Sequence, residues 1–138
     1  MEKTITVQAT ISAPVEKVWD YWTLPEHITQ WNAASDDWHT PHAENDLRPG
    51  GKFLSRMEAR DGKVGFDFEG TYETVIKYAL IVYSMPNGRK VKVYFSGEGE
   101  ITNIVETFDA EDIHTAEQQR AGWQAILNNF KSYTEGNK

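Results

Sequence analysis

The sequence has no cysteine among its 138 residues. This absence excludes disulfide bonds, thiolate metal sites and cysteine nucleophiles. It is also typical of proteins that stay in a reducing compartment, so we expect a cytoplasmic protein.

Long apolar segments are missing as well. Residues 1–7 lack the apolar core of a signal peptide, and no stretch approaches the roughly 20 apolar residues that cross a bilayer. We therefore expect neither export nor membrane insertion. Because no linker, repeat or low-complexity segment divides the chain, a single domain is expected over residues 1–138.

Positive charge is scarce. The chain has 14 Lys and Arg residues against 21 Asp and Glu residues, which gives a formal net charge of −7. Its basic run at residues 89–92 is too short to offset this charge locally. Such a chain repels a phosphate backbone, which disfavours nucleic acid as a partner.

The usual signatures of catalysis and metal binding are also weak. No Gly-x-Ser-x-Gly turn occurs, and the four histidines indicate no nucleophilic triad. The residue types that bind metals cluster in one polar segment, at His39, His42, Glu44 and Asp46. Pro41 disfavours a helical pair of histidines there, and loop acids are usually solvated. We therefore predict no metal site, no cofactor and no catalytic residue.

Alternating apolar and polar residues predict a run of antiparallel strands. The predicted strands are residues 4–11, 52–58, 66–73, 78–85, 90–95 and 100–108. Asp61-Gly62 predicts a two-residue hairpin, and residues 86–88 predict another turn. Asp67 and Glu69 alternate with aromatic residues, so we place both carboxylates on the solvent face. Residues 32–48 are predicted to form a polar loop with at most one short strand.

Apolar stripes predict three helices. Two short helices follow the first strand, and the second is predicted to begin with a capping box from Thr23 to Glu26. The third and longest helix opens with another capping-box spacing, from Thr115 to Gln118, and is free of proline. This order of elements predicts an α+β domain with its helices on one face of an antiparallel sheet.

Several motifs occur together in a fixed order: Ser12-Ala13-Pro14, Val18-Trp19, Trp31, residues 47–53 (LRPGGKF), Phe68-Glu69-Gly70 and Gly122-Trp123. In this order the chain resembles the activator of Hsp90 ATPase homologue 1-like family, within the SRPBCC superfamily of START and Bet v 1-like domains. The resemblance implies the helix-grip fold, in which a curved antiparallel sheet wraps around a long C-terminal helix. It also implies a cavity between the two, which in relatives often takes a lipid, hormone, aromatic or polyketide-like ligand.

The motifs shared with this family imply turns and core contacts in this chain, and they imply no catalytic residue. Gly50 and Gly51 are expected to supply unusual backbone angles, Arg48 to lie in a turn or on the surface, and Gly122 to let the helix approach its neighbours closely. Larger Hsp90 activators join such a domain to a further N-terminal domain. The single domain expected here makes a chaperone-activating role the less favoured interpretation.

Aromatic residues are abundant, at 12% of the chain with five tryptophans, and they must line a solid core or a pocket. We predict a ligand-binding cavity lined by Phe53, Met57, Phe66, Phe68, Tyr72, Phe95, Trp123, Leu127 and Phe130. The partner that we expect is a small hydrophobic or aromatic molecule, and the sequence leaves both a monomer and a homodimer open.

Two other functions remain open at this point. A cyclase-like or hydratase-like enzyme needs a polar residue on an inward face, for which Ser55, Tyr72 and Asn103 are the candidates. Buried polar groups of this kind are more often structural, because they normally find hydrogen-bond partners inside the fold. The other function is a protein-interaction module, for instance a chaperone cofactor.

Overall fold

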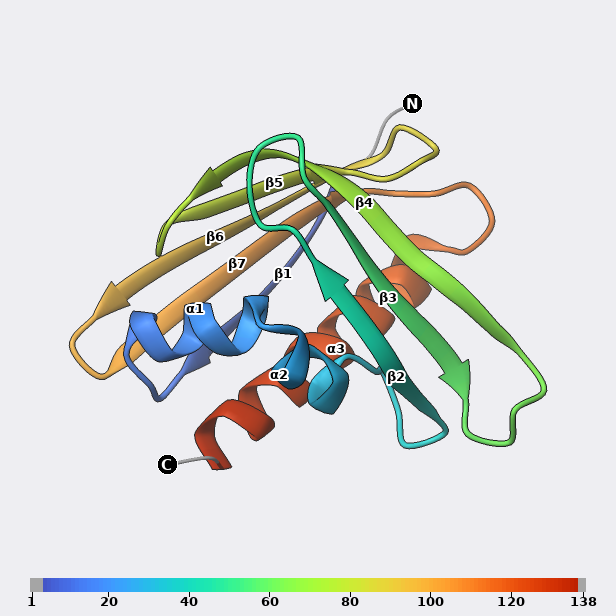
Figure 1. The fold of residues 1–138 in the computed structure, drawn as a ribbon, viewed down its shortest axis with the longest axis horizontal. Helices are drawn as coiled ribbons and strands as arrows, with labels where there is room; N and C mark the ends of the chain where they lie inside the picture. Colours follow the sequence, from blue (N-terminus) through green and yellow to red (C-terminus); the bar gives the residue numbers. More distant parts are fainter. Residues whose placement is uncertain (1–3, 137–138) are drawn as a thin grey trace.

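One curled sheet dominates the computed structural model, which describes residues 4–136 (Figure 1). Its strands are β1 (Thr4–Ile11), β2 (Trp38–Asn45), β3 (Lys52–Ala59), β4 (Gly65–Ile76), β5 (Leu80–Ser84), β6 (Lys90–Glu98) and β7 (Ile101–Asp109). They lie in the order β1-β7-β6-β5-β4-β3-β2, and every neighbouring pair is antiparallel. The first two strands of the chain therefore form the two edges of the sheet.

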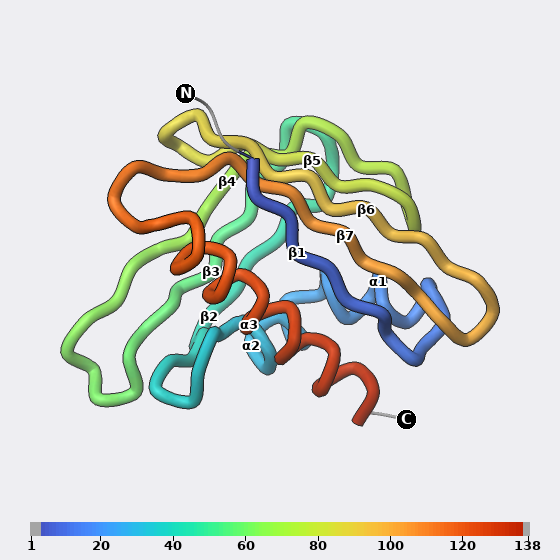
Figure 2. The backbone as a smooth tube through the Cα atoms, turned by 180° about the vertical axis from the view of Figure 1, so that it is seen from behind, coloured from blue at the N-terminus to red at the C-terminus, as the bar shows by residue number. Residues whose placement is uncertain are grey.

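Three helices complete the fold. They are α1 (Val15–Thr23), α2 (Pro25–Trp31) and α3 (Ala116–Gly136). The short helices connect the two edge strands, and α3 crosses the inside of the curl and contacts β1 and α2 (Figures 1 and 2). This arrangement confirms the predicted α+β helix-grip fold. None of the helices in residues 4–136 is both long and apolar enough to cross a membrane.

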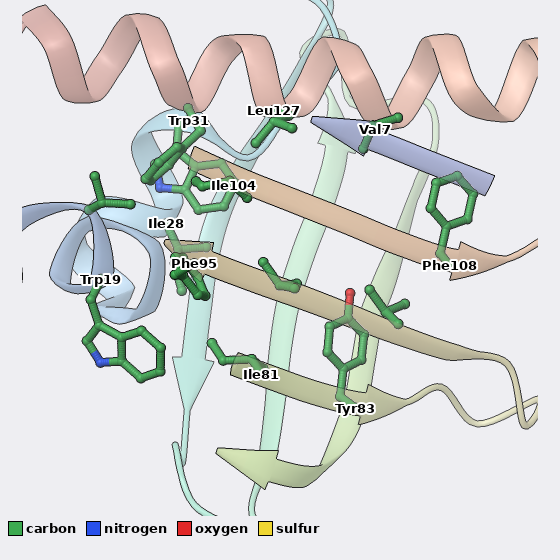
Figure 3. Close-up of a cluster of buried hydrophobic side chains, with 14 of the residues drawn as sticks. Val7, Trp19, Ile28, Trp31, Ile81, Tyr83, Phe95, Ile104, Phe108 and Leu127 are labelled. Carbon is green, nitrogen blue, oxygen red and sulfur yellow. The ribbon is translucent and has the colours of Figure 1, made fainter. Parts of the chain in front are cut away.

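Strand β1 shows how alternation places side chains in the core. Ile5, Val7 and Ile11 are buried, whereas the threonines between them face solvent. The register with β7 pairs Ile5 with Phe108 and brings Val7 opposite Glu106. Buried hydrophobic side chains of this kind lie between the sheet and α3 (Figure 3).

Of the two predicted capping boxes, one is confirmed and one is wrong. At the start of α3, the backbone N–H of Gln118 donates to Thr115 Oγ1 at 3.1 Å, and the Thr115 N–H donates to Gln118 Oε1 at 2.9 Å. At α2, however, Leu24 is the N-cap and makes no side-chain bond. Thr23 still belongs to α1, where its hydroxyl donates to the Trp19 carbonyl at 2.8 Å and so cannot cap the next helix.

The polar segment 32–48 contains the eight-residue edge strand β2. Its pairing with β3 is irregular between His39 and His42, where Pro41 interrupts the ladder. Proline is tolerated at such a position because an edge strand has one unpaired side and a bulge needs fewer donors. Thr40 alone among its residues is fully buried, which explains why its sequence shows no clear alternation.

The hairpin at Asp61-Gly62 is confirmed in place but not in length. Five residues, 60–64, connect β3 and β4, and only Gly62 has a positive φ, of 77°. The predicted strand 78–85 is shorter in the structure, because Tyr78 adopts a φ of 67° and forms a turn before β5.

At two of the motif glycines, Gly51 and Gly70, a side chain would collide with neighbouring atoms, and neither has a positive φ. Gly50 has the expected positive φ, of 85°, but Gly51 does not, and a Cβ there would collide with the Asp46 carbonyl oxygen. The expectation for Gly122 is wrong, since nothing lies within 4 Å of a Cβ added to it. Close approach occurs instead at Gly70, where a Cβ would lie 2.7 Å from the Phe53 ring and 2.9 Å from the Ser84 carbonyl oxygen.

The glycines give a matched pair of alanine substitutions. Gly70→Ala should destabilise the protein by about 1–3 kcal/mol, because the backbone of the neighbouring strand cannot move away. Gly122→Ala should stabilise it by about 0.5–1 kcal/mol, because glycine is a poor residue in a helix interior. Urea unfolding of both variants measures the difference. A destabilised Gly122→Ala protein would contradict the open space around this glycine.

Candidate functional site

A cavity of about 230 Å³ lies between the sheet and the helices. Its walls are mostly aromatic and aliphatic, and they come from α1, α2 and α3 on one side and from β2, β3, β4, β5 and β7 on the other. The aromatic wall residues are Trp22, Trp31, Phe53, Phe66, Phe68, Tyr72, Tyr83 and Trp123. A concave, largely apolar space with few polar groups is typical of a small-molecule site.

The nine predicted lining residues divide into two groups. Six of them border the cavity: Phe53, Met57, Phe66, Phe68, Tyr72 and Trp123. The other three, Phe95, Leu127 and Phe130, lie outside its lining and are at most 5% exposed. They support the wall from behind, since the ring centre of Phe130 lies 4.9 Å from that of Trp22 and 5.0 Å from that of Trp31.

The aromatic walls are held in place by ring contacts. The Trp123 ring stacks on Phe108 with a centroid distance of 4.0 Å and an angle of 12°. Trp31 stacks on Trp22 at 5.0 Å, and its indole N–H donates to the Tyr21 carbonyl at 2.9 Å. Such contacts hold the rings in fixed positions.

One side of the cavity opens to solvent near β2 and the β3–β4 hairpin. Phe66 lines the cavity and is 48% exposed, and its ring centre lies 5.9 Å from that of Trp38. Glu44, an exposed residue of β2, also borders the cavity, and its carboxylate pairs with His42 at 2.7 Å. These residues mark the entrance.

The polar side chains predicted to face inward differ in their location and in their hydrogen bonds. Ser55 is 4% exposed and borders the cavity, opposite Phe68 on the next strand. The hydroxyl of Tyr72 donates to Asn45 Oδ1 at 2.6 Å, and the Asn45 amide donates in turn to the Thr23 carbonyl at 2.6 Å. Burial raises the pKa of Tyr72 above its ordinary value, so this hydroxyl is a structural group.

The inward placement of Asn103 is wrong. Its side chain is exposed, and its Oδ1 accepts a hydrogen bond from the Thr10 hydroxyl at 2.7 Å. Strand β7 turns its other face inward, where Thr102, Ile104, Glu106 and Phe108 are buried. The prediction therefore selected the wrong face of this strand.

Glu106 is the functional candidate that sequence reasoning missed. It borders the cavity at 6% exposure, between Val7 of β1 and Val93 of β6 in the sheet register. Within residues 4–136 its carboxyl group has no hydrogen-bond partner, and burial raises its pKa to about 8. The signal was the shared spacing of Ile104, Glu106 and Phe108, which places the acid on the apolar face.

Tyr83 of β5 is a second polar residue that borders the cavity, and the charge of Glu106 acts on it. Its hydroxyl points into the space between the sheet and α3 (Figure 3) and has no hydrogen-bond partner among the described residues. Burial raises the pKa of Tyr83 well above its ordinary value, and the charge of Glu106 adds to the shift. The cavity therefore presents a carboxyl and a phenol that the fold itself does not satisfy.

The charges around the cavity are of one sign. Its lining includes Glu44 and Glu106 but, within the described part of the chain, no Lys, Arg or His. No group of three or more acidic or histidine side chains in residues 4–136 is arranged to hold a metal ion. His42 and Glu44 pair with each other, and Asp46 pairs with Arg48 at 3.0 Å.

Asp67 and Glu69 are both exposed, as predicted, and Asp67 lies 3.3 Å from the guanidinium of Arg56. These two carboxylates therefore face solvent and take no part in the cavity.

Comparison with known proteins reveals close relatives among solved structures. The model of the family described as "Activator of Hsp90 ATPase homolog 1-like protein" matches residues 12–135. An AHSA1-like protein from Aeromonas hydrophila is 47% identical with a TM-score of 0.91, and the match covers 97% of this chain and 93% of that one. A protein from Cytophaga hutchinsonii is 52% identical with a TM-score of 0.83 over the same shares.

More distant solved structures are similar to this chain in fold alone. A protein from Nitrosomonas europaea is 19% identical with a TM-score of 0.80, and the match covers 98% of this chain and 96% of that one. No curated protein matches the sequence.

Because of Glu106, the free energy of unfolding should decrease as the pH rises. Between pH 4.5 and about 8 the unfolded chain has lost the Glu106 proton while the folded protein keeps it, so the free energy of unfolding decreases across this window and is level on either side. Glu106→Gln should remove this decrease. At about 1.4 kcal/mol per pKa unit, the variant should exceed the wild type by a few kcal/mol at pH 9.

Urea unfolding at pH 4.5, 7 and 9 measures this difference. Glu98→Gln is the control, because Glu98 is exposed at the end of β6. Equal pH profiles for Glu106→Gln and the wild type would show that the carboxyl is solvated.

Proposed function

The chain belongs to the family of activator of Hsp90 ATPase homolog 1-like proteins, and we propose that it binds a small hydrophobic or aromatic molecule in the cavity between its sheet and α3. The observation that carries this proposal is the cavity of about 230 Å³ with walls of aromatic side chains. A solid core of the same residues would leave no such space, because protein interiors are normally close-packed.

The size of the cavity restricts the ligand. An apolar cavity of about 150 Å³ accepts benzene, so the larger space here suits one substituted ring or a small bicyclic molecule. The stacked pairs Trp22–Trp31 and Phe108–Trp123 hold the walls in position. A preformed site of this kind loses little side-chain entropy when the ligand enters.

Enzymatic use of the same cavity is a second function that one observation favours. Ser55, Tyr83 and Glu106 all border the cavity, and the carboxyl of Glu106 is able to give or take a proton near neutral pH. A chaperone-cofactor role, by contrast, rests on the name of the family rather than on a feature of the described residues, and we do not propose it.

Native mass spectrometry of the purified protein tests the binding function directly. We expect a complex with one small molecule, which is released on denaturation and identified by its fragments. Incubation of that molecule with fresh protein should return it unchanged. A change in its mass or isomeric form that Glu106→Gln abolishes would instead establish the enzymatic function.

Filling the cavity should block binding without unfolding the protein. Ser55→Leu adds two heavy atoms net at a buried position that borders the cavity, so we expect at least a tenfold loss of affinity for a neutral probe, 2-phenylethanol. Chemical-shift titration of ¹⁵N-labelled protein measures the affinity and reports the fold in the same spectra. Ser96→Leu, at an exposed position of β6, is the matched control. Equal affinities for the two folded variants would place the ligand elsewhere.

A further inference from the structure

The unsatisfied carboxyl of Glu106 needs a physical explanation. Buried polar groups in folded proteins almost always have hydrogen-bond partners, because an unpaired one loses its hydration without compensation. Tyr72 follows this rule through its bond to Asn45. Glu106 and Tyr83 have no such partner among the described residues, and both border the cavity, at 6% and 8% exposure, so that their polar atoms adjoin cavity space rather than close-packed protein.

The surroundings of Glu106 are apolar on nearly every side. Its neighbours in the sheet are Val7 of β1 and Val93 of β6, and α3 contributes Trp123 and Ile126 across the cavity. From β5, Tyr83 is the titratable group that faces it. Arg89, in the turn between β5 and β6, lies outside the cavity lining, donates to the Asp109 carbonyl at 3.2 Å and has a buried Nε without a hydrogen-bond partner among the described residues.

The acidic groups and the aromatic rings of the cavity together indicate the sign of the ligand's charge. Two carboxyl groups, Glu44 at the entrance and Glu106 inside, border the cavity with no basic side chain among its described lining residues. Anionic ligands such as carboxylates find no basic side chain to pair with in this lining, and they are repelled once Glu106 is ionised. A cation is attracted both by the acids and by the faces of aromatic rings.

Resting on the proposed function, we propose that the ligand carries a basic nitrogen: it is a small aryl or alkyl amine whose ammonium group lies between Glu106 and Tyr83, with its apolar part among the aromatic rings. The ammonium donates to the Glu106 carboxylate and to the Tyr83 oxygen, which gives both unsatisfied groups a partner. The tryptophan, phenylalanine and tyrosine rings surround the rest of the molecule.

Proton balance follows from this arrangement. In the free protein near neutral pH the Glu106 carboxyl keeps its proton, because its pKa is about 8. When the protonated amine enters, the carboxyl releases this proton to solvent and the amine keeps its own, so a neutral ion pair remains in the cavity. Binding of the amine must therefore tighten as the pH rises toward 8, by up to about tenfold per pH unit.

Isothermal titration calorimetry with three probes of matched shape tests the inference. The probes are 2-phenylethylamine, 2-phenylethanol and phenylacetate, which carry a cation, a neutral hydroxyl and an anion. At pH 8 the amine should bind at least tenfold more tightly than the alcohol, and phenylacetate should bind more weakly than both. Titrations at pH 6.5 in two buffers of different ionisation enthalpy should show close to one proton released per amine bound.

Variants locate the effect at Glu106. Glu106→Gln should bind the amine at least tenfold more weakly at pH 8 and should release no proton, because the amide neither ionises nor pairs with a cation. Its binding of 2-phenylethanol shows whether the cavity still forms. Glu98→Gln, in which an exposed acid is changed, should behave like the wild type.

The outcomes separate this inference from the proposed function. If the alcohol binds as tightly as the amine, or if the amine releases no proton, the ligand has no basic nitrogen at Glu106 while the cavity remains a binding site. A co-purified molecule without a basic nitrogen would likewise contradict the inference about the amine while supporting the cavity as a binding site. If no probe binds and native mass spectrometry finds no bound molecule, both proposals are wrong.

Discussion

The packing of α3 against one half of a curled sheet is the constraint on which the rest of the structure depends. Leu127 and Phe130 are fully buried in this contact, and Trp123 stacks on Phe108 of β7. A straight helix follows a curved sheet closely over only part of its width. Between α3 and strands β3 and β4 the large rings meet at their edges, as Phe68 and Trp123 do with ring centres 6.3 Å apart, and the cavity occupies the space that these side chains leave.

Polar groups in the interior divide according to this geometry. On the side of β2 and α1, the groups are close enough to satisfy each other, as the chain from Tyr72 through Asn45 to the Thr23 carbonyl shows. Thr102 is equally satisfied, through its bond to the Ala13 carbonyl at 2.8 Å. Glu106 and Tyr83 face the cavity instead, where no protein group is within reach, and this difference marks them as candidates for function rather than structure.

The sequence was most informative where a single pattern decided the local structure. The alternation in β1, the apolar stripe of α3 and the Thr115–Gln118 capping box each predicted what the structure contains. Six of the nine predicted lining residues border the cavity, because inward-facing aromatics must meet there.

Patterns that allow two answers were less informative. Strand β7 carries polar residues on both faces, so shifting its assignment by one residue exchanged Asn103 for Glu106. The hydroxyl of Thr23 fits the end of one helix as well as the start of the next, and the backbone path between α1 and α2 made the choice. The spacing of Ile104, Glu106 and Phe108 indicates the inward face of β7, whereas the bond that Thr23 makes depends on the path of the backbone between α1 and α2.

Retaining an acid at position 106 has a thermodynamic consequence for the protein itself. At neutral pH the folded state must hold a proton that the unfolded chain has released, which lowers stability by a few kcal/mol, a large part of the 5–15 kcal/mol that typically separates folded from unfolded domains. Glutamine or leucine at this position would avoid the loss. An amine that pairs with the carboxylate restores part of it, because a ligand that binds only the folded state adds its binding free energy to stability. Under the proposed binding of an amine, ligand occupancy, pH and stability would be coupled through this one side chain.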